Sequence, residues 1–309
     1  MPPIVKARLS PARVLHRAAD RMAPRFARLF LEVTARVRAR VTDTTNPDRL
    51  VGWLDWQTVT KAAEPADLYR QAYAEVVSGS VLDMVGYVEA ELGVPSALIA
   101  GRFDVVYPQV VRAAETLTAQ LVRDVSEESK QAIRRIVATG VRDGLAPAEQ
   151  ARLIRNVVGL SERQAVAVAN FRRGMLDRGT PPARVDRLVE RRAARALRER
   201  AETIARTETL RAAAAGQVAL WGELKAQGVL SPGFRQRWLV AHDDRLCPEC
   251  APMDGKTVEV GGAFTQTERG VLPSTRVPFA GPTVEHPPLH PRCRCVLVAD
   301  VPEPEASRA

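Results

Sequence analysis

The sequence predicts an α+β protein with predominantly α-helical N-terminal and middle regions and a small, loop-rich α/β module at the C-terminus. Alanine and arginine dominate the first 230 residues, a composition that favours helices over sheets. Beyond residue 231, glycine and proline become frequent, and short β-branched or alternating stretches predict strands. All four cysteines of the chain lie in this last part. We expect four segments, with bounds 1–130, 131–230, 231–300 and 301–309.

The N-terminal region, residues 1–130, begins with a predicted helix over residues 10–41, in which Pro24 predicts a kink or a break. A turn cluster follows at residues 42–48, and a second helix is predicted from Pro65 to about Leu92. Four apolar residues recur at every fourth position of the first helix and predict its buried stripe: Leu29, Val33, Val37 and Val41.

The middle region, residues 131–230, predicts short helices joined by tight turns and followed by one long helix. Ser161 and Gln164 have the spacing of a capping box, which predicts that a helix begins directly after Ser161. Pro147 and Pro182 stand where helices commonly begin. The long helix is predicted from Pro182 to about Ala226.

The C-terminal module, residues 231–300, predicts three short strands separated by loops, with mainly loop from Gly261 to Pro288. The tail at 301–309 is predicted to be disordered. The three predicted strands are residues 237–241, 257–260 and 295–298.

The cysteines form the pattern Cys247-x-x-Cys250 and Cys293-x-Cys295, with His290 just before the second pair. Zinc binds four ligands drawn from Cys and His, so five candidates are available for one closed, structural site. Either all four cysteines, or Cys247, Cys250, His290 and one of the second pair, complete the set. Structural zinc contributes about 10–16 kcal/mol in small modules, enough to hold a loop-rich segment. The alternatives are cysteines without metal, reduced or disulfide-bonded, and redox chemistry.

The chain is basic, with a formal net charge of +9 and a pI near 9.9. This balance suits a polyanionic partner such as nucleic acid or an acidic protein surface. Five arginines at three- and four-residue steps share one face of the long helix and are the candidates for binding such a partner: Arg184, Arg187, Arg191, Arg195 and Arg198. The alternative is that this face is solvated and that Glu190 and Glu199 partly neutralise its charge.

Several classes of protein do not fit the sequence. No stretch resembles a signal peptide or the roughly 20 apolar residues of a membrane span, so we expect a reducing cytoplasm and no membrane. A zinc-stapled His–Asn–His nuclease needs an asparagine in the same module as its histidines. No asparagine follows Asn170, so the sequence excludes this class of enzyme. Neither a glycine-rich phosphate loop nor a Ser/His/Asp signature occurs. We therefore expect no enzymatic activity.

A set of short motifs carries a family resemblance: the segment from Gly159 to Ala165, the segment from Ala201 to Thr209, Asp244-Arg-Leu-Cys-Pro-Glu-Cys250, Met253-Asp-Gly255 and His290-Pro-Arg-Cys-Arg-Cys295. In this order they resemble the phage Mu F-type head-morphogenesis proteins, the minor capsid proteins of tailed bacteriophages. The resemblance covers about residues 140–298, and its closing His-Pro-x-Cys-Arg-Cys motif is the most specific part.

The resemblance implies a low-copy head protein that acts with the portal vertex, capsid or scaffold during procapsid assembly, with packaged DNA as a further partner. It implies a location in the host cytoplasm during assembly and then in the virion, at the capsid interior or portal vertex. It implies no established catalytic activity. Some relatives carry an additional domain after the motif, which we do not expect in the short segment after Val298. The rival hypotheses are a zinc-containing DNA-binding protein and an ADP-ribosyltransferase-like enzyme.

Overall fold

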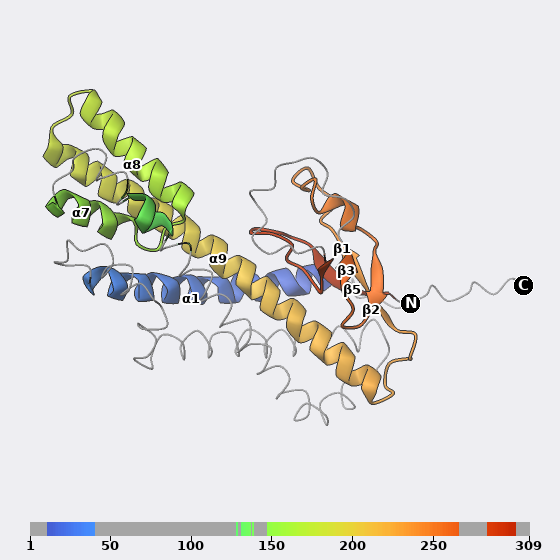
Figure 1. Cartoon of the computed structure of the whole chain (residues 1–309). Helices are drawn as coiled ribbons and strands as arrows, with labels where there is room; N and C mark the ends of the chain where they lie inside the picture. Colours follow the sequence, from blue (N-terminus) through green and yellow to red (C-terminus); the bar gives the residue numbers. More distant parts are fainter. Residues whose placement is uncertain are drawn as a thin grey trace, which may run out of the picture. The chain divides into compact units, whose positions relative to one another are not determined.

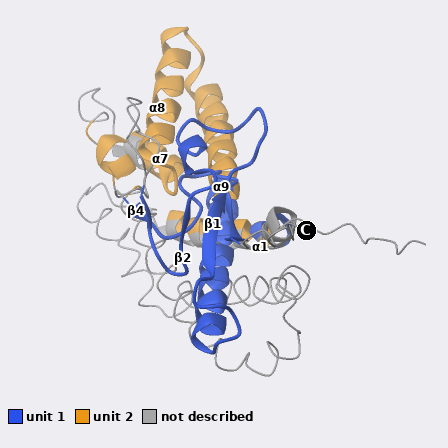
Figure 2. Ribbon diagram, turned by 90° about the vertical axis from the view of Figure 1, so that its right-hand side faces the viewer, with its two compact units in different colours: residues 1–23, 72–115, 203–309 blue, residues 24–71, 116–202 orange. Residues whose placement is uncertain are grey.

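The computed structural model divides into two compact units, which Figure 2 distinguishes by colour. Helices α1 (Pro11–Arg40) and α9 (Pro182–Ala226) each contribute residues to both units. The described residues are 11–23, 203–265 and 283–300 in unit 1, and 24–40, 128, 131–136, 138 and 147–202 in unit 2.

Helix α1 confirms the first predicted helix and continues through Pro24 without a break. In its second half Phe30 and Thr34 are fully buried. The side chains of the predicted stripe (Leu29, Val33, Val37 and Val41) lie outside the described residues, as do the predicted turn at 42–48 and the helix predicted from Pro65.

Unit 2 is helical. Figure 1 shows α7 (Pro147–Val157) and α8 (Glu162–Asp177) beside the first half of α9. The predicted capping box is confirmed, because the Gln164 N–H donates to Ser161 Oγ at 3.4 Å and the Ser161 N–H donates to Gln164 Oε1 at 3.2 Å. Arg38 of α1 donates to the Asn156 and Val158 carbonyls at 3.2 and 3.3 Å, which satisfies acceptors at the end of α7.

Helix α9 has the predicted bounds, and its two halves differ in burial. From Pro182 to Glu202 it is amphipathic, with Val185, Val189 and Leu197 buried. In the second half, eight consecutive residues from Thr207 to Ala214 are buried. Because eight residues exceed two helical turns, the helix is covered on every side here, within unit 1.

The C-terminal part of unit 1 contains an antiparallel three-stranded sheet in the order β2-β1-β5. The strand predicted at 237–241 instead covers residues 235–239, because its pairing with β2 and β5 includes Arg235 and Gln236. A second pair, β3 with β4, was not predicted and lies in the segment expected to be mainly loop. The strands are β1 (Arg235–Leu239), β2 (Thr257–Glu259), β3 (Phe264–Thr265), β4 (Thr283–Val284) and β5 (Val296–Asp300).

Aromatic pairs join these elements into a core. Trp238 of β1 meets Phe264 edge to face, with ring centroids 5.3 Å apart. Trp221 of α9 meets Phe234, just before β1, at 5.5 Å in the same geometry. The fold is therefore mixed, with helices in the middle and a small strand-rich region at the C-terminus. Within the described part of the chain, no helix combines the length and the apolar character that crossing a bilayer requires.

Candidate metal centre

The first half of the centre is a tight turn after β1. The Cys250 N–H lies 3.2 Å from the Cys247 carbonyl, which closes the turn, and the Ala251 N–H donates to the same carbonyl at 3.1 Å. The Cys250 N–H also reaches Cys247 Sγ at 3.2 Å. Both thiols therefore lie on the same side of one turn, and the first sulfur already accepts a backbone hydrogen bond.

The second half repeats this turn before β5. The Cys293 N–H donates to the His290 carbonyl at 3.0 Å, so His290 and Cys293 also stand three residues apart on one turn. His290 Nδ1 donates to the Pro291 carbonyl at 2.8 Å. This hydrogen bond assigns the proton to Nδ1 and leaves the Nε2 lone pair available, as it is in most histidines that bind a metal.

The two turns bring their donor atoms together. His290 Nε2 lies 3.0 Å from Cys247 Sγ and 3.2 Å from Cys250 Sγ, and Cys250 Sγ lies 3.7 Å from Cys293 Sγ. Two groups form, each with donor atoms within 4.8 Å of one another: Cys247, Cys250 and His290, and Cys250, Cys293 and Cys295. All five residues predicted as ligands therefore meet around Cys250. None of the four cysteines forms a disulfide.

This donor set fits a metal ion. Three of the thiols are almost fully buried, and thiolate and imidazole are the ligands that zinc takes in structural sites. Zinc–sulfur bonds of 2.3 Å at tetrahedral angles place two sulfurs about 3.8 Å apart, close to the Cys250–Cys293 separation. The residues present can hold one metal ion.

The neighbouring cysteine thiols shift one another's pKa values. A hydrogen bond from Cys250 lowers the pKa of Cys293 to about 2, and the same interaction raises the pKa of Cys250. The pKa of Cys295 is raised to about 12, because its hydrogen bond with Cys250 lowers it less than its contact with Cys293 and its burial raise it. Buried thiolates this close repel one another, and a bound cation removes that repulsion.

A charged pair ties the two turns together. The Arg294 guanidinium binds both carboxylate oxygens of Asp243, with Nη2 to Oδ1 at 2.6 Å. Hydrogen bonds from Arg294 hold the pKa of Asp243 well below its usual range. Asp243 Oδ1 also accepts the Arg245 N–H at 2.9 Å, which shapes the loop before Cys247. The arginine between the two cysteines of the second pair therefore anchors the loop of the first pair.

Two threonines of helix α9 form hydrogen bonds with the second turn. Arg292 has a left-handed backbone with φ of 63°. Its N–H donates to Thr207 Oγ1 at 3.2 Å, and its Nε donates to Thr203 Oγ1 at 2.9 Å. Sequence reasoning missed both threonines. The available signal was their four-residue spacing, which places two hydroxyls on one face of an alanine- and arginine-rich helix.

The other two C-terminal histidines make different contacts. His242 Nε2 lies 3.3 Å from Asp254 Oδ2, and Asp254 Oδ1 accepts the Val240 N–H at 3.1 Å. His286 Nδ1 donates to the Pro287 carbonyl at 2.7 Å, and burial lowers its pKa. Neither histidine belongs to the two donor groups found among the described residues.

The five predicted arginines are all exposed on the first half of α9, opposite its buried apolar residues. Arg195 pairs with Glu199 at 2.9 Å. Arg184, Arg187, Arg191 and Arg198 have no acidic partner among the residues that the structure describes. The structure places these guanidinium groups on one accessible face of unit 2, distant in sequence from the cysteine cluster. We call this set of five residues the arginine face.

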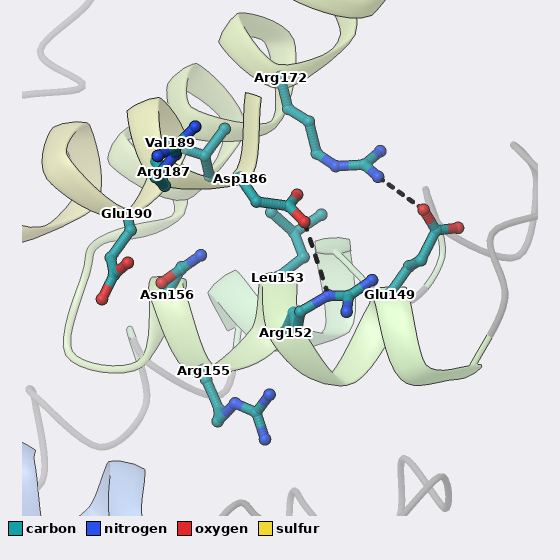
Figure 3. A pocket seen from close by; sticks show the side chains of 10 residues that line it. All are labelled: Glu149, Arg152, Leu153, Arg155, Asn156, Arg172, Asp186, Arg187, Val189 and Glu190. Atoms are coloured by element: carbon teal, nitrogen blue, oxygen red, sulfur yellow. Dashed lines mark hydrogen bonds and ion pairs between the residues drawn. The ribbon is translucent and has the colours of Figure 1, made fainter. Parts of the chain in front are cut away.

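A cavity of about 240 Å³ lies among α7, α8 and α9 in unit 2 (Figure 3). Its lining includes four arginines and three carboxylates, and Figure 3 shows two ion pairs among them. Arg172 lies 3.0 Å from Glu149, and Arg152 lies 3.9 Å from Asp186. Two of the four arginines are therefore already paired with carboxylates of the same cavity.

Comparison with known proteins identifies the family. The model of the family described as Phage Mu protein F like protein matches residues 131–298, more than half of the chain. The matched range contains α7, α8, α9 and both turns of the cysteine cluster. Neither a curated protein nor a solved structure matches the chain significantly. From the family match, the chain belongs to the Phage Mu protein F like family.

Proposed function

We propose that this protein is a minor head protein that acts during procapsid assembly, at the portal vertex or the capsid interior. The observation that carries the proposal is the family match, which points to phage head morphogenesis. In this proposal the protein is a structural component and not an enzyme. It works with portal, capsid or scaffold proteins in the host cytoplasm and then remains in the virion.

The proposal is tested by co-expressing the protein with the portal, major capsid and scaffold proteins of the same phage, each pair separately. We expect the protein to co-purify with one of them, and particles from an infected host to contain it in few copies. A phage lacking the gene should produce defective heads. Absence from purified particles, together with normal heads in the deletion phage, would contradict the proposal.

We also propose that zinc is the metal of the cysteine cluster and that it has a structural role. Support comes from the soft donors, the 3.7 Å sulfur separation and the surplus of candidates, which leaves no open coordination position for a substrate. The site then acts as a staple that joins the turn after β1 to the turn before β5.

A second function is favoured by the arginine face. We propose that it contacts a polyanion, with the phosphates of packaged DNA as the first candidate. Five exposed guanidinium groups follow one helix face, and four of them lack an acidic partner among the described residues. Arginine presents a planar set of donors suited to phosphate oxygens.

Replacing Arg187, Arg191 and Arg195 by glutamate tests this surface. Binding to duplex DNA should weaken, and the slope of log K against log salt should fall by about 0.9 for each lost phosphate contact. The matched control replaces three other exposed arginines of unit 2 by glutamate (Arg163 and Arg173 of α8, and Arg178 directly after it), which changes the net charge equally. Equal loss of affinity in both triple variants would show that overall charge, and not this face, determines binding.

A further inference from the structure

We propose that the metal is held by Cys247, Cys250, His290 and Cys293, and that Cys295 is not a ligand. This assignment rests on the proposed metal site and selects four of its five candidates. Distance alone does not separate Cys293 from Cys295, because both lie within 4.8 Å of Cys250. The local backbone does separate them.

The two turns have the same construction. Cys247-Pro-Glu-Cys250 and His290-Pro-Arg-Cys293 each have a donor at the first and fourth positions and proline at the second. Each is closed by an N–H of the fourth residue directed at the first carbonyl, at 3.2 and 3.0 Å. A turn of this kind directs its first and fourth side chains to one side. The relevant spacing of the second half is therefore His-x-x-Cys, which matches the Cys-x-x-Cys of the first half.

His290 belongs to the set because of its hydrogen bonds. Its Nδ1 is already bonded to the Pro291 carbonyl, and its Nε2 points between the sulfurs of the first turn at 3.0 and 3.2 Å. An imidazole nitrogen this close to two thiols needs either a shared proton or a shared metal ion. A site made of the four cysteines alone would leave this nitrogen without a role.

Cys293 is prepared as the fourth ligand by its surroundings. Its Sγ lies 3.7 Å from Cys250 Sγ, and its N–H donates to the His290 carbonyl at 3.0 Å. The residue before it, Arg292, is held in a left-handed conformation by two threonines of α9. Helix α9 therefore contributes to the shape of the second turn.

Cys295 has a different backbone setting. It lies outside the turn that the Cys293 N–H closes on the His290 carbonyl, and it directly precedes strand β5. The thiol of Cys295 contributes to the buried core beneath the sheet, next to the metal ligands but outside their set.

The experiment measures zinc per chain by native mass spectrometry, and ligand type by the absorption spectrum after Co²⁺ replaces zinc. The full-length protein is compared with Cys295→Ser, Cys293→Ser and His290→Cys. Cys295→Ser should keep one zinc and the unchanged Co²⁺ spectrum. Cys293→Ser should lose zinc or the thiolate-to-cobalt intensity of one sulfur. His290→Cys should gain the intensity of one sulfur.

The outcomes separate the two proposals. No zinc and no Co²⁺ thiolate bands in the wild-type protein reject the metal site itself. One zinc in the wild type, with Cys295→Ser losing thiolate intensity or His290→Cys gaining none, rejects the assignment of the four ligands and keeps the site. If Cys293→Ser does not fold, Cys295→Ser and His290→Cys still decide, since the first retains all four proposed donors and the second replaces His290 by another residue that binds zinc.

Discussion

Gly159 joins α7 to α8 and has a φ of 81°, which L side chains rarely adopt. A Cβ built on it would lie 2.7 Å from Thr34 Cγ2 and 2.9 Å from Leu197 Cδ1. Both neighbours are buried, so neither has space to move. This residue therefore permits the close approach of α1 and α9 to the turn within unit 2.

We predict that Gly159→Ala lowers the free energy of unfolding by about 2–5 kcal/mol, of which about 1–2 come from the left-handed backbone and about 1–3 from overpacking. The matched control is Gly179→Ala. Gly179 has a φ of 73° but nothing within 4 Å of the added Cβ, so only the backbone cost applies. Chemical denaturation measures both variants. Equal destabilisation would show that steric contact at Gly159 has no effect.

Helix α9 serves two purposes along its length. Its first half is amphipathic and exposes the arginine face, whereas its second half is covered on all sides. The buried half still carries charge: Glu208 and Arg211 form an ion pair at 3.2 Å, and both are almost completely buried. Removing one partner of such a pair typically costs about 3–5 kcal/mol, because the remaining charge is left in a medium of low polarity.

The same helix links the family motifs. The segment from Ala201 to Thr209 and the His-Pro-Arg-Cys turn are more than 80 residues apart, and they meet through Thr203, Thr207 and Arg292. Gln217, which lies further along α9, donates to the Leu297 carbonyl of β5 at 3.2 Å. Helix α9 therefore supports both the metal centre and the sheet of unit 1.

At the scale of the whole molecule, the metal centre belongs to unit 1 only, whereas the capping box and the arginine face belong to unit 2. The sheet of unit 1 has three short strands. It depends on the turns around the cysteine cluster for its connections. Unit 2 is formed by helices, with the capping box at the start of α8 and the Arg38 guanidinium at the end of α7. Loss of metal should therefore affect the two units unequally.

We predict that a zinc chelator reduces hydrogen-exchange protection in β1 and β5 and leaves α8 protected. Zinc binding is coupled to folding, and protons compete with zinc for thiolates and imidazole, so acidification should have the same effect as the chelator. Exchange is followed by mass spectrometry of peptides, with the zinc-saturated chelator as control. Unchanged protection of β1 and β5, or equal loss in α8, would contradict the prediction.

The sequence by itself determined the features that depend on neighbouring residues. These features are the capping box at Ser161 and Gln164 and the beginnings of α7 and α9 at Pro147 and Pro182. These predictions are confirmed because a helix end or a tight turn satisfies its own hydrogen bonds within a few residues.

Only the tertiary structure decided which distant groups meet. The strand at Arg235 begins earlier than predicted because pairing with β2 and β5, and not its own composition, sets its register. The sequence offered Cys293 and Cys295 as equivalent donors. The structure gives them different backbone settings, since Cys293 closes a turn that hydroxyls of α9 contact, whereas Cys295 directly precedes β5. Such contacts arise from packing between elements remote in sequence, which no local pattern records.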